Sequence, residues 1–206
     1  MTPFRDSHHG EGAESGMVPR PIAHPVPELH PLLRARWSPI AFDSSHVLTD
    51  AAVDLLLEAA RWAPSAGNSQ PWAFVTAVRG RPEHVRITHR LAPSSRRWAP
   101  DANLLVVNVA HRYVEDTSME FSEFADYDLG QAVAHMTLQA QAMGLACRQF
   151  RAFDLDGLTA DLELAPGWQV LSMTAVGRPL GESPERERRT LTHLRQAPLK
   201  ASGAES

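Results

Sequence analysis

Residues 61–72, RWAPSAGNSQPW, place several small hydrogen-bonding side chains between two tryptophans. Asn68 and Gln70 each offer a donor and an acceptor, which suits the uracil-like edge of a flavin ring. The Ser65 hydroxyl can donate to a phosphate or to a ribityl hydroxyl. The same side chains would equally satisfy backbone groups in a loop that follows a helix. Residue types alone leave both interpretations open.

Arginines form a second candidate group, at two distant positions of the chain. The segment RARWSPIAF contains Arg34, Arg36 and Ser38, and the segment ERERR adds Arg186, Arg188 and Arg189. An arginine beside a hydroxyl is suited to binding a phosphate, because the guanidinium forms paired, charge-assisted hydrogen bonds. Surface arginines are common, so spacing alone favours solvated side chains in both segments.

Several well-known site motifs are missing from the sequence. No Gly-x-Gly-x-x-Gly follows a strand-like segment, and no Gly-x-x-x-x-Gly-Lys-Ser/Thr or Gly-x-Ser-x-Gly occurs. A phosphate-bearing cofactor would therefore have to be held by side chains, and hydrolysis by a serine nucleophile is not supported. The ten histidines lack the His-Glu-x-x-His spacing, and Cys147 is the single cysteine, so we expect no metal and no disulfide.

Composition indicates an ordinary folded protein. With 206 residues, the chain is long enough for one domain with a sizeable core. The formal net charge of -4 provides no basic field for nucleic acid. No apolar run approaches the roughly 20 residues of a membrane-spanning helix, and the N-terminus lacks the pattern of a secretory signal. We therefore expect a cytoplasmic protein without nucleic-acid or membrane partners.

Helix-like and strand-like patterns alternate along the chain. Thr49 provides an N-cap for a helix that ends before Pro64. The longest expected helix, 128–143, has an apolar stripe and ends at Gly144, and its small residues would let another helix approach closely. The remaining expected elements are strands at 72–78, 103–110, 145–150 and 168–177 and helices at 82–91 and 154–163. This order predicts a sheet covered by helices, of α+β or α/β class.

The two ends of the chain differ in composition from its middle. Residues 1–28 are rich in Gly, Pro, His and Ser and could not bury enough apolar surface to offset their ordering entropy. We expect a disordered or loosely attached arm there, a folded domain over 29–190, and a flexible tail over 191–206.

The segment AARWAPSAGNSQPWAF resembles the hallmark of the nitroreductase family of FMN-dependent oxidoreductases, in which Ala-Pro-Ser-x-x-Asn-x-Gln-Pro-Trp joins a helix to a strand. RWSPIAF is similar to the flavin-phosphate motif of that family, YDLGQAVAHMTLQAQAMGLAC to its central helix, and TAVGRP to its last core strand. The resemblance spans roughly residues 29–190 in the right order. It implies an α+β fold with a central mixed β-sheet flanked by helices and a long helix at a dimer interface.

The resemblance also implies a role for each candidate residue. Arg36 and Ser38 would hold the phosphate and ribityl chain of FMN, with Arg34 assisting, and Arg186 and Arg188 would close on the phosphate. Four residues would approach the flavin from the partner subunit of a homodimer, namely Pro64, Ser65, Asn68 and Gln70. The active site would then lie across the dimer interface.

Several positions depart from the family pattern. Ile40 stands where a second Arg or Lys is common, and Trp98 and Ser95 stand where many members have a Lys and an Asn against the flavin. Arg151 and Ala152 replace a Glu-Gly pair beside flavin N5. These changes leave FMN binding as the expectation but alter the substrate side, where Arg151 would favour an anionic substrate or bind a phosphate.

The implied activity is hydride transfer from NADH or NADPH through flavin N5 to a nitroaromatic, quinone or other electron-poor acceptor, with no catalytic side chain required. An oxidase or dehydrogenase of a biosynthetic intermediate, and a non-catalytic protein that stores FMN, are the alternatives. Three aromatic residues before the long helix are candidates for a lid over the flavin, although core packing is expected of at least one: Phe121, Phe124 and Tyr127.

Overall fold

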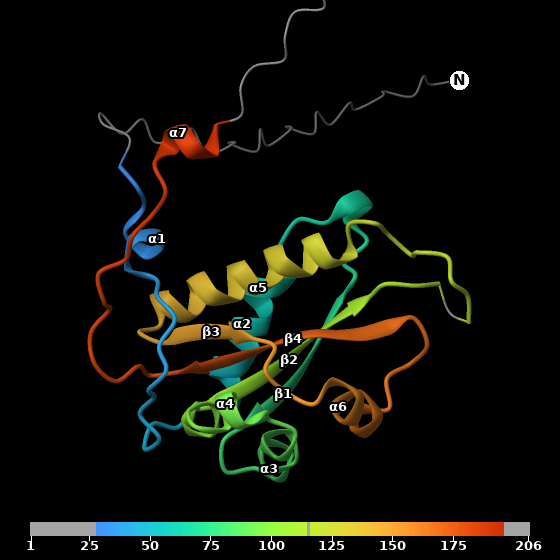
Figure 1. Cartoon of the computed structure of the whole chain (residues 1–206), viewed down its shortest axis with the longest axis horizontal. Coiled ribbons are helices and arrows are strands. Elements are labelled where there is room, and N and C mark those ends of the chain that lie inside the picture. The colour runs from blue at the N-terminus through green and yellow to red at the C-terminus, as the bar shows by residue number, and fades with distance from the viewer. Residues whose placement is uncertain (1–27, 115, 196–206) are drawn as a thin grey trace, which may run out of the picture.

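The computed structural model describes residues 28–114 and 116–195, which form a four-stranded sheet with helices on both faces (Figure 1). The strands are β1 (Trp72–Val78), β2 (Leu104–His111), β3 (Ala146–Phe150) and β4 (Trp168–Gly177). The helices are α1 (Pro31–Ala35), α2 (Asp50–Arg61), α3 (Pro82–His89), α4 (Pro93–Arg96), α5 (Ala125–Ala142), α6 (Leu155–Leu162) and α7 (Leu191–Leu194). Single 3-10 turns occur at η1 (Ala66–Asn68) and η2 (Ala99–Asp101).

The strand order is β1-β2-β4-β3, and every neighbouring pair runs antiparallel. The expectation of an α+β fold is confirmed, but the expectation of a mixed sheet is wrong for the described residues. The sheet is antiparallel because of the position of β4. The crossover through α5 joins β2 to β3, which run in the same direction, and β4 inserts between them in the opposite direction. The sequence alternation of strands and helices does not reveal that insertion.

Each face of the sheet has its own hydrophobic core. Helices α2 and α5 cover one face, and α3, α4 and α6 cover the other (Figure 1). Strand β2 contributes to both cores, since Leu104 and Val106 point toward α2 and α5 whereas Leu105 and Val107 point away from them. All four side chains are fully buried, which explains why the segment is a continuous apolar run rather than an alternating one.

The two longest helices largely follow their sequence patterns. The Thr49 hydroxyl accepts a hydrogen bond from the backbone N–H of Ala52, and α2 begins at Asp50 as expected. Helix α5 begins at Ala125, three residues earlier than expected, with Asp126 and Asp128 in its first turn, where carboxylates are favoured by the helix dipole. Its expected apolar stripe faces the sheet, and Gly130 on another side of the helix is exposed.

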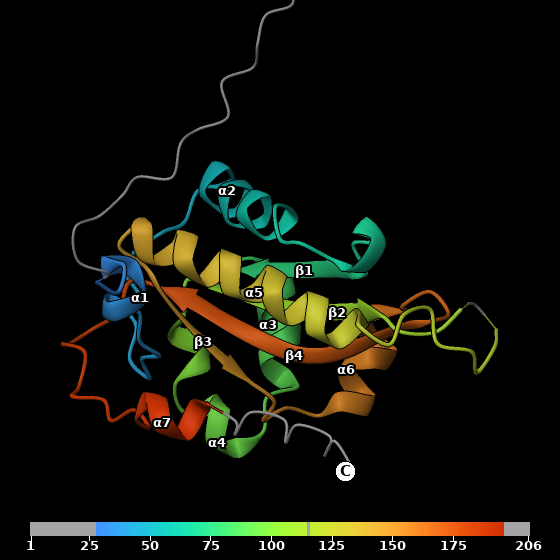
Figure 2. The ribbon, with the colours of Figure 1, turned by 90° about the horizontal axis from the view of Figure 1, so that it is seen from above.

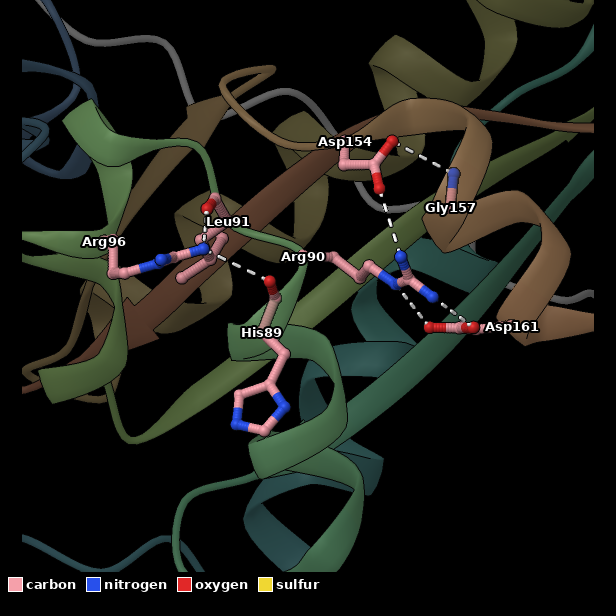
Figure 3. Close-up of polar contacts among 7 residues, drawn as sticks. All are labelled: His89, Arg90, Leu91, Arg96, Asp154, Gly157 and Asp161. Carbon is pink, nitrogen blue, oxygen red and sulfur yellow. Dashed lines mark hydrogen bonds and ion pairs between the residues drawn. The ribbon is translucent and has the colours of Figure 1, made fainter.

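Helix α6 is tied to the end of α3 by an arginine that binds two carboxylates (Figure 3). The Arg90 guanidinium donates to both oxygens of Asp161, at 2.6 and 2.7 Å, and to Asp154 at 3.1 Å. Asp154 also caps α6 by accepting from the backbone N–H of Gly157, where any side chain would overlap Asp154. This network fixes the position of α6, which forms one wall of a cleft beside the sheet.

The sequence did not predict the short helices α1, α4 and α7, because one or two turns carry little periodic signal. The arm at 1–28 and the end of the tail lie almost wholly outside the described residues, and α7 lies within the segment assigned to the tail. The division into arm, domain and tail therefore stays a prediction. Within residues 28–114 and 116–195, no helix is long and apolar enough to cross a membrane.

Candidate functional site

The fold brings together the two arginine segments that are 150 residues apart in the sequence. The guanidinium of Arg186 donates to the backbone carbonyls of Arg34 and Arg36. Arg36 in turn donates to the Ser38 hydroxyl at 3.2 Å. We call this group, with the nearby Arg188, the arginine cradle, and it lies beside β3 at the edge of the sheet (Figure 2).

The charges of the arginine cradle are not balanced by acidic side chains. Burial lowers the pKa of Arg36, and the charges of Arg186 and Arg188 lower this pKa further. None of the six ion pairs among residues 28–114 and 116–195 includes an arginine of the cradle. Three guanidinium groups held near one another without a carboxylate have the charge and the hydrogen-bond donors that suit a polyanion such as a phosphate.

Arg148 on β3 adjoins the arginine cradle, and the sequence reasoning missed it. Its guanidinium donates to the Ser38 carbonyl at 3.1 Å and lies over the Trp98 ring, 5.2 Å from the ring centroid. Trp98 packs edge-on against Phe150, with ring centroids 5.0 Å apart. The sequence did contain a signal for Arg148, which is a charged residue in the strand segment LACRQF. A charge on a strand at a sheet edge needs a polar partner.

The loop from Pro64 to Gln70 is held in a strained conformation. Asn68 and Gln70 have φ angles of 56° and 48°, which non-glycine residues rarely adopt. The Ser65 hydroxyl accepts from the Gln70 backbone N–H at 3.0 Å, so this side chain satisfies the loop itself. Gln70 also donates to Asn68, and both side chains remain exposed. Strain of this kind is concentrated at binding and active sites.

A buried carboxylate anchors that loop to the start of α5. Asp128 is only 2% exposed, and one of its oxygens accepts from the Ala66 backbone N–H at 2.9 Å. The other oxygen accepts from Gln131, which also donates to the Pro64 carbonyl at 3.4 Å. The loop is thus tied to α5 at two of its backbone groups, the Ala66 N–H and the Pro64 carbonyl. Sequence reasoning placed Asp128 at the beginning of the helix but did not predict this function.

The strained loop and the arginine cradle lie at opposite ends of α5. Both Figure 1 and Figure 2 place α1 beside the C-terminal half of α5 and the η1 turn beside its N-terminal end. Within one chain, the structure therefore joins Arg34, Arg36, Ser38, Arg186 and Arg188 but does not bring Pro64, Ser65, Asn68 and Gln70 to them.

Two clefts lie along the outer side of α5 and the adjoining strands. One, of about 440 Å³, lies between α1, α5 and the polar side chains of Gln149 and Ser172. The other, of about 540 Å³, is lined by α6, Arg112 and Arg151. Leu171 borders both clefts, and its carbonyl accepts from Arg151 at 2.9 Å. Arg151 thus stands between the two clefts rather than in the arginine cradle.

The other residues singled out from the sequence have mostly structural environments. Phe121 stacks on His111 with centroids 4.4 Å apart but is 42% exposed, and Phe124 is 46% exposed, so the expectation that at least one of the three lid candidates packs in the core is wrong. Tyr127 is 65% exposed and Ile40 is 61% exposed. Burial raises the pKa of the Cys147 thiol to about 12, so this thiol stays protonated and is a poor nucleophile. In the described part of the chain no three His, Cys, Asp or Glu residues form a metal-ligand group, and the expectation of no metal stays a prediction.

Comparisons with known proteins agree with the motif order. A model described as the nitroreductase family matches residues 33–104, which include Arg34 and Arg36, the strained loop and β1. A Streptomyces coelicolor protein with the provisional name NADH dehydrogenase/NAD(P)H nitroreductase is 27% identical over 64% of this chain and 74% of its own. Over these residues the chain is similar to the nitroreductase family. Protein DrgA of Synechocystis is 25% identical over 71% of this chain and 82% of its own.

Solved structures place the chain in the nitroreductase-like fold. A crystal structure of an oxidoreductase containing FMN superposes with a TM-score of 0.70 at 27% identity and covers 77% of this chain and 80% of the other. A nitroreductase from Desulfovibrio desulfuricans, solved in complex with FMN, gives a TM-score of 0.68 at 24% identity over 83% of this chain and 99% of the other. The chain thus shares the fold of these FMN-containing proteins.

Proposed function

We propose that this chain is an FMN-dependent oxidoreductase that passes a hydride from NADH or NADPH, through flavin N5, to a nitroaromatic, quinone or other electron-poor acceptor. The observation that carries the proposal is the arginine cradle. Its guanidinium groups and the Ser38 hydroxyl fit a dianionic phosphate, and they lack carboxylate partners in the described ranges. Relatives that contain FMN lend further support.

Each group of residues has a separate task in this proposal. The arginine cradle binds the phosphate and so fixes one end of FMN at the open edge of β3. Bound FMN supplies hydride transfer, which needs no acid or base from a side chain. The strained loop contributes the exposed amides of Asn68 and Gln70, whose paired donors and acceptors suit the edge of the flavin ring.

We further propose that the active unit is a homodimer. The loop and the cradle lie at opposite ends of α5, so one chain cannot bring both to one flavin. A second copy packed against α5 would place its loop beside the first copy's cradle. The exposed small residues Gly130 and Ala134 permit close approach of a second helix, since no side chain lies within 4 Å of a Cβ built at Gly130.

An anaerobic reduction experiment tests this function. The purified protein should bind FMN and show the spectrum of oxidised flavin. NADH or NADPH should then bleach the visible band of the flavin on the time scale of turnover. Addition of a nitroaromatic or a quinone should restore the band. Sedimentation should give a dimer of the 22.7 kDa chain.

The same experiment separates the alternatives. A flavin that neither nicotinamide reduces, but that a different organic donor bleaches, would indicate an oxidase or dehydrogenase. A flavin that stays oxidised with every donor would indicate storage. Protein that cannot be reconstituted with FMN would contradict the proposal as a whole.

A further inference from the structure

The cleft of about 540 Å³ beside α6, which we call the α6 cleft, contains two arginines with different partners. The Arg112 guanidinium donates to both carboxylate oxygens of Asp126 and, at 3.3 Å, to Gln169. Arg151 takes part in none of the ion pairs in the described part of the chain, and its guanidinium donates to the Leu171 carbonyl. Arginine carries five N–H donors, so most of those of Arg151 remain available to a ligand.

The fold places Arg151 where the sheet loses a strand. Strand β3 ends at Phe150, which pairs with Met173, whereas β4 begins at Trp168. The register between β2 and β4 shifts in this region and leaves Leu171 as an extra residue on β4. Such bulges occur often beside active sites. Because Arg151 donates to the carbonyl of this extra residue at 2.9 Å, its guanidinium is held at the α6 cleft.

Leu171 also connects the α6 cleft to the cleft of about 440 Å³ that Arg36 borders. Leu171 packs against Leu129 and Val133, toward the N-terminal half of α5. Helix α1, which precedes Arg36, lies beside the C-terminal half of α5 (Figure 1 and Figure 2). A ligand whose phosphate binds the arginine cradle can therefore extend along α5 toward Leu171, where the α6 cleft begins.

The other walls of the α6 cleft suit an aromatic molecule. Leu155 of α6 and Trp168 and Val170 of β4 provide apolar surface. One further carboxylate, that of Asp156, lines the cleft from α6, is exposed, and forms no ion pair in the described ranges. This charge would repel an anionic ligand that Arg151 attracts, so the two side chains should affect its binding in opposite directions.

We propose that Arg151 binds the carboxylate of an electron-poor aromatic acceptor, and that the α6 cleft selects acceptors which carry this group. The inference rests on the proposed FMN-dependent function. Of the two roles expected for Arg151 from the sequence, it favours an anionic substrate over a phosphate, because the phosphate-binding charges are gathered in the arginine cradle and Arg151 lies outside it. Arg151 thus determines specificity and takes no part in hydride transfer.

The test compares two acceptors of nearly the same shape, 4-nitrobenzoate and the uncharged 4-nitrobenzamide. Arg151→Gln should raise the KM of the FMN-loaded protein for 4-nitrobenzoate roughly tenfold, because a hydrogen bond to a charged group is lost. Its kcat, and its KM for 4-nitrobenzamide, should stay at the wild-type values. Binding of 4-nitrobenzoate to the oxidised protein without a nicotinamide, measured by the change in the flavin spectrum, should weaken by the same factor. Arg151→Lys should restore part of the affinity.

Two further variants serve as controls. Arg97→Gln removes an exposed arginine that also lies outside the ion pairs of the described residues, and it should leave both acceptors unaffected. Asp156→Asn removes a charge from the α6 cleft itself and should tighten the binding of 4-nitrobenzoate. A loss of 4-nitrobenzoate affinity in Asp156→Asn would show that the shape of the cleft, and not its charge, governs binding, and would overturn the inference.

Three other results would contradict the role of Arg151. Equal losses for 4-nitrobenzoate and 4-nitrobenzamide in Arg151→Gln would show that the carboxylate is not recognised. A loss confined to the affinity of the apoprotein for FMN, with riboflavin binding intact, would assign Arg151 to the flavin phosphate. A rise confined to the KM for NADPH, with that for NADH unchanged, would assign it to the phosphate of the electron donor. Wild-type protein that binds FMN but reduces neither acceptor would instead contradict the proposed function, while binding to the oxidised protein would still test Arg151.

Discussion

The two ends of α5 hold residues of opposite character. The arginine cradle at one end consists of like charges with no acidic partner in the described ranges, and burial, followed by the charges of its neighbours, lowers the pKa of Arg36. The strained loop at the other end is nearly neutral, and its backbone is anchored by the buried Asp128 carboxylate. The cradle is electrostatically incomplete without an anion, whereas the loop is internally satisfied but conformationally strained.

This difference indicates how each end is expected to respond to substitution. Removing a cradle residue should weaken ligand binding more than folding, because like-charge repulsion is relieved in the empty protein. Removing a loop contact should affect stability, because the contacts there hold an unfavourable backbone.

The largest effect is expected for Arg36→Ala. Hydrogen bonds to charged groups contribute about 1.5–3 kcal/mol, so FMN affinity should fall roughly ten- to hundredfold. Riboflavin affinity and the thermal midpoint of the apoprotein should stay near those of Arg97→Ala, the matched surface control. Titration of each apoprotein by flavin fluorescence quenching measures the difference. Equal losses for FMN and riboflavin would place the phosphate elsewhere.

Asp128→Ala should give the largest loss of stability at the loop end. The substitution removes the charged acceptor of the Ala66 N–H and one of the two acceptors of the Gln131 amide, and a hydrogen bond to a charged group contributes about 1.5–3 kcal/mol. Urea denaturation of the apoprotein measures the change, and hydrogen exchange should show faster exchange in residues 64–70. Gln131→Ala, which removes a weaker and more exposed contact, is the control. Equal stability of the two variants would show that Asp128 is not the anchor.

Sequence patterns predicted the helices and strands better than their arrangement. The boundaries of β1 and β4 agree with the expected strands because Gly, Pro and turn residues flank them. The order of strands could not be read from the chain, since the insertion of β4 depends on contacts between distant segments. The same limit applies to the site. The residue types of Arg36 and Asn68 suited a flavin, but their separation along α5, and the position of Arg148, follow from packing.

A smaller effect is expected at Gln70, where backbone strain can be separated from side-chain chemistry. A left-handed conformation costs a non-glycine residue roughly 1–2 kcal/mol, and glycine adds about 0.5–1 kcal/mol of entropy cost on folding. Gln70→Gly should therefore change the free energy of unfolding by less than about 1 kcal/mol, whereas the β-branched Gln70→Val should be clearly destabilising. If both variants lose flavin affinity alike, the Gln70 amide contacts the cofactor. If only Gln70→Val loses flavin affinity, the backbone conformation at residue 70 determines flavin binding.

The smallest effect concerns Glu58, which joins the end of α2 to the tryptophan that precedes the strained loop. Hydrogen bonds from Arg61 and Trp62 lower the pKa of Glu58 to about 2, from an ordinary value of 4.5. A lowered pKa means that this stabilisation is present above pH 4.5 and is lost as pH falls through about 2. The indole N–H resonance of Trp62 should therefore shift between these pH values in wild type and stay constant in Glu58→Gln. Since the side chains of Glu58 and Arg61 are largely exposed, the cradle should bind FMN equally well in wild type and in Glu58→Gln at neutral pH. A loss of FMN affinity in Glu58→Gln would show that the two ends of α5 are coupled within one chain.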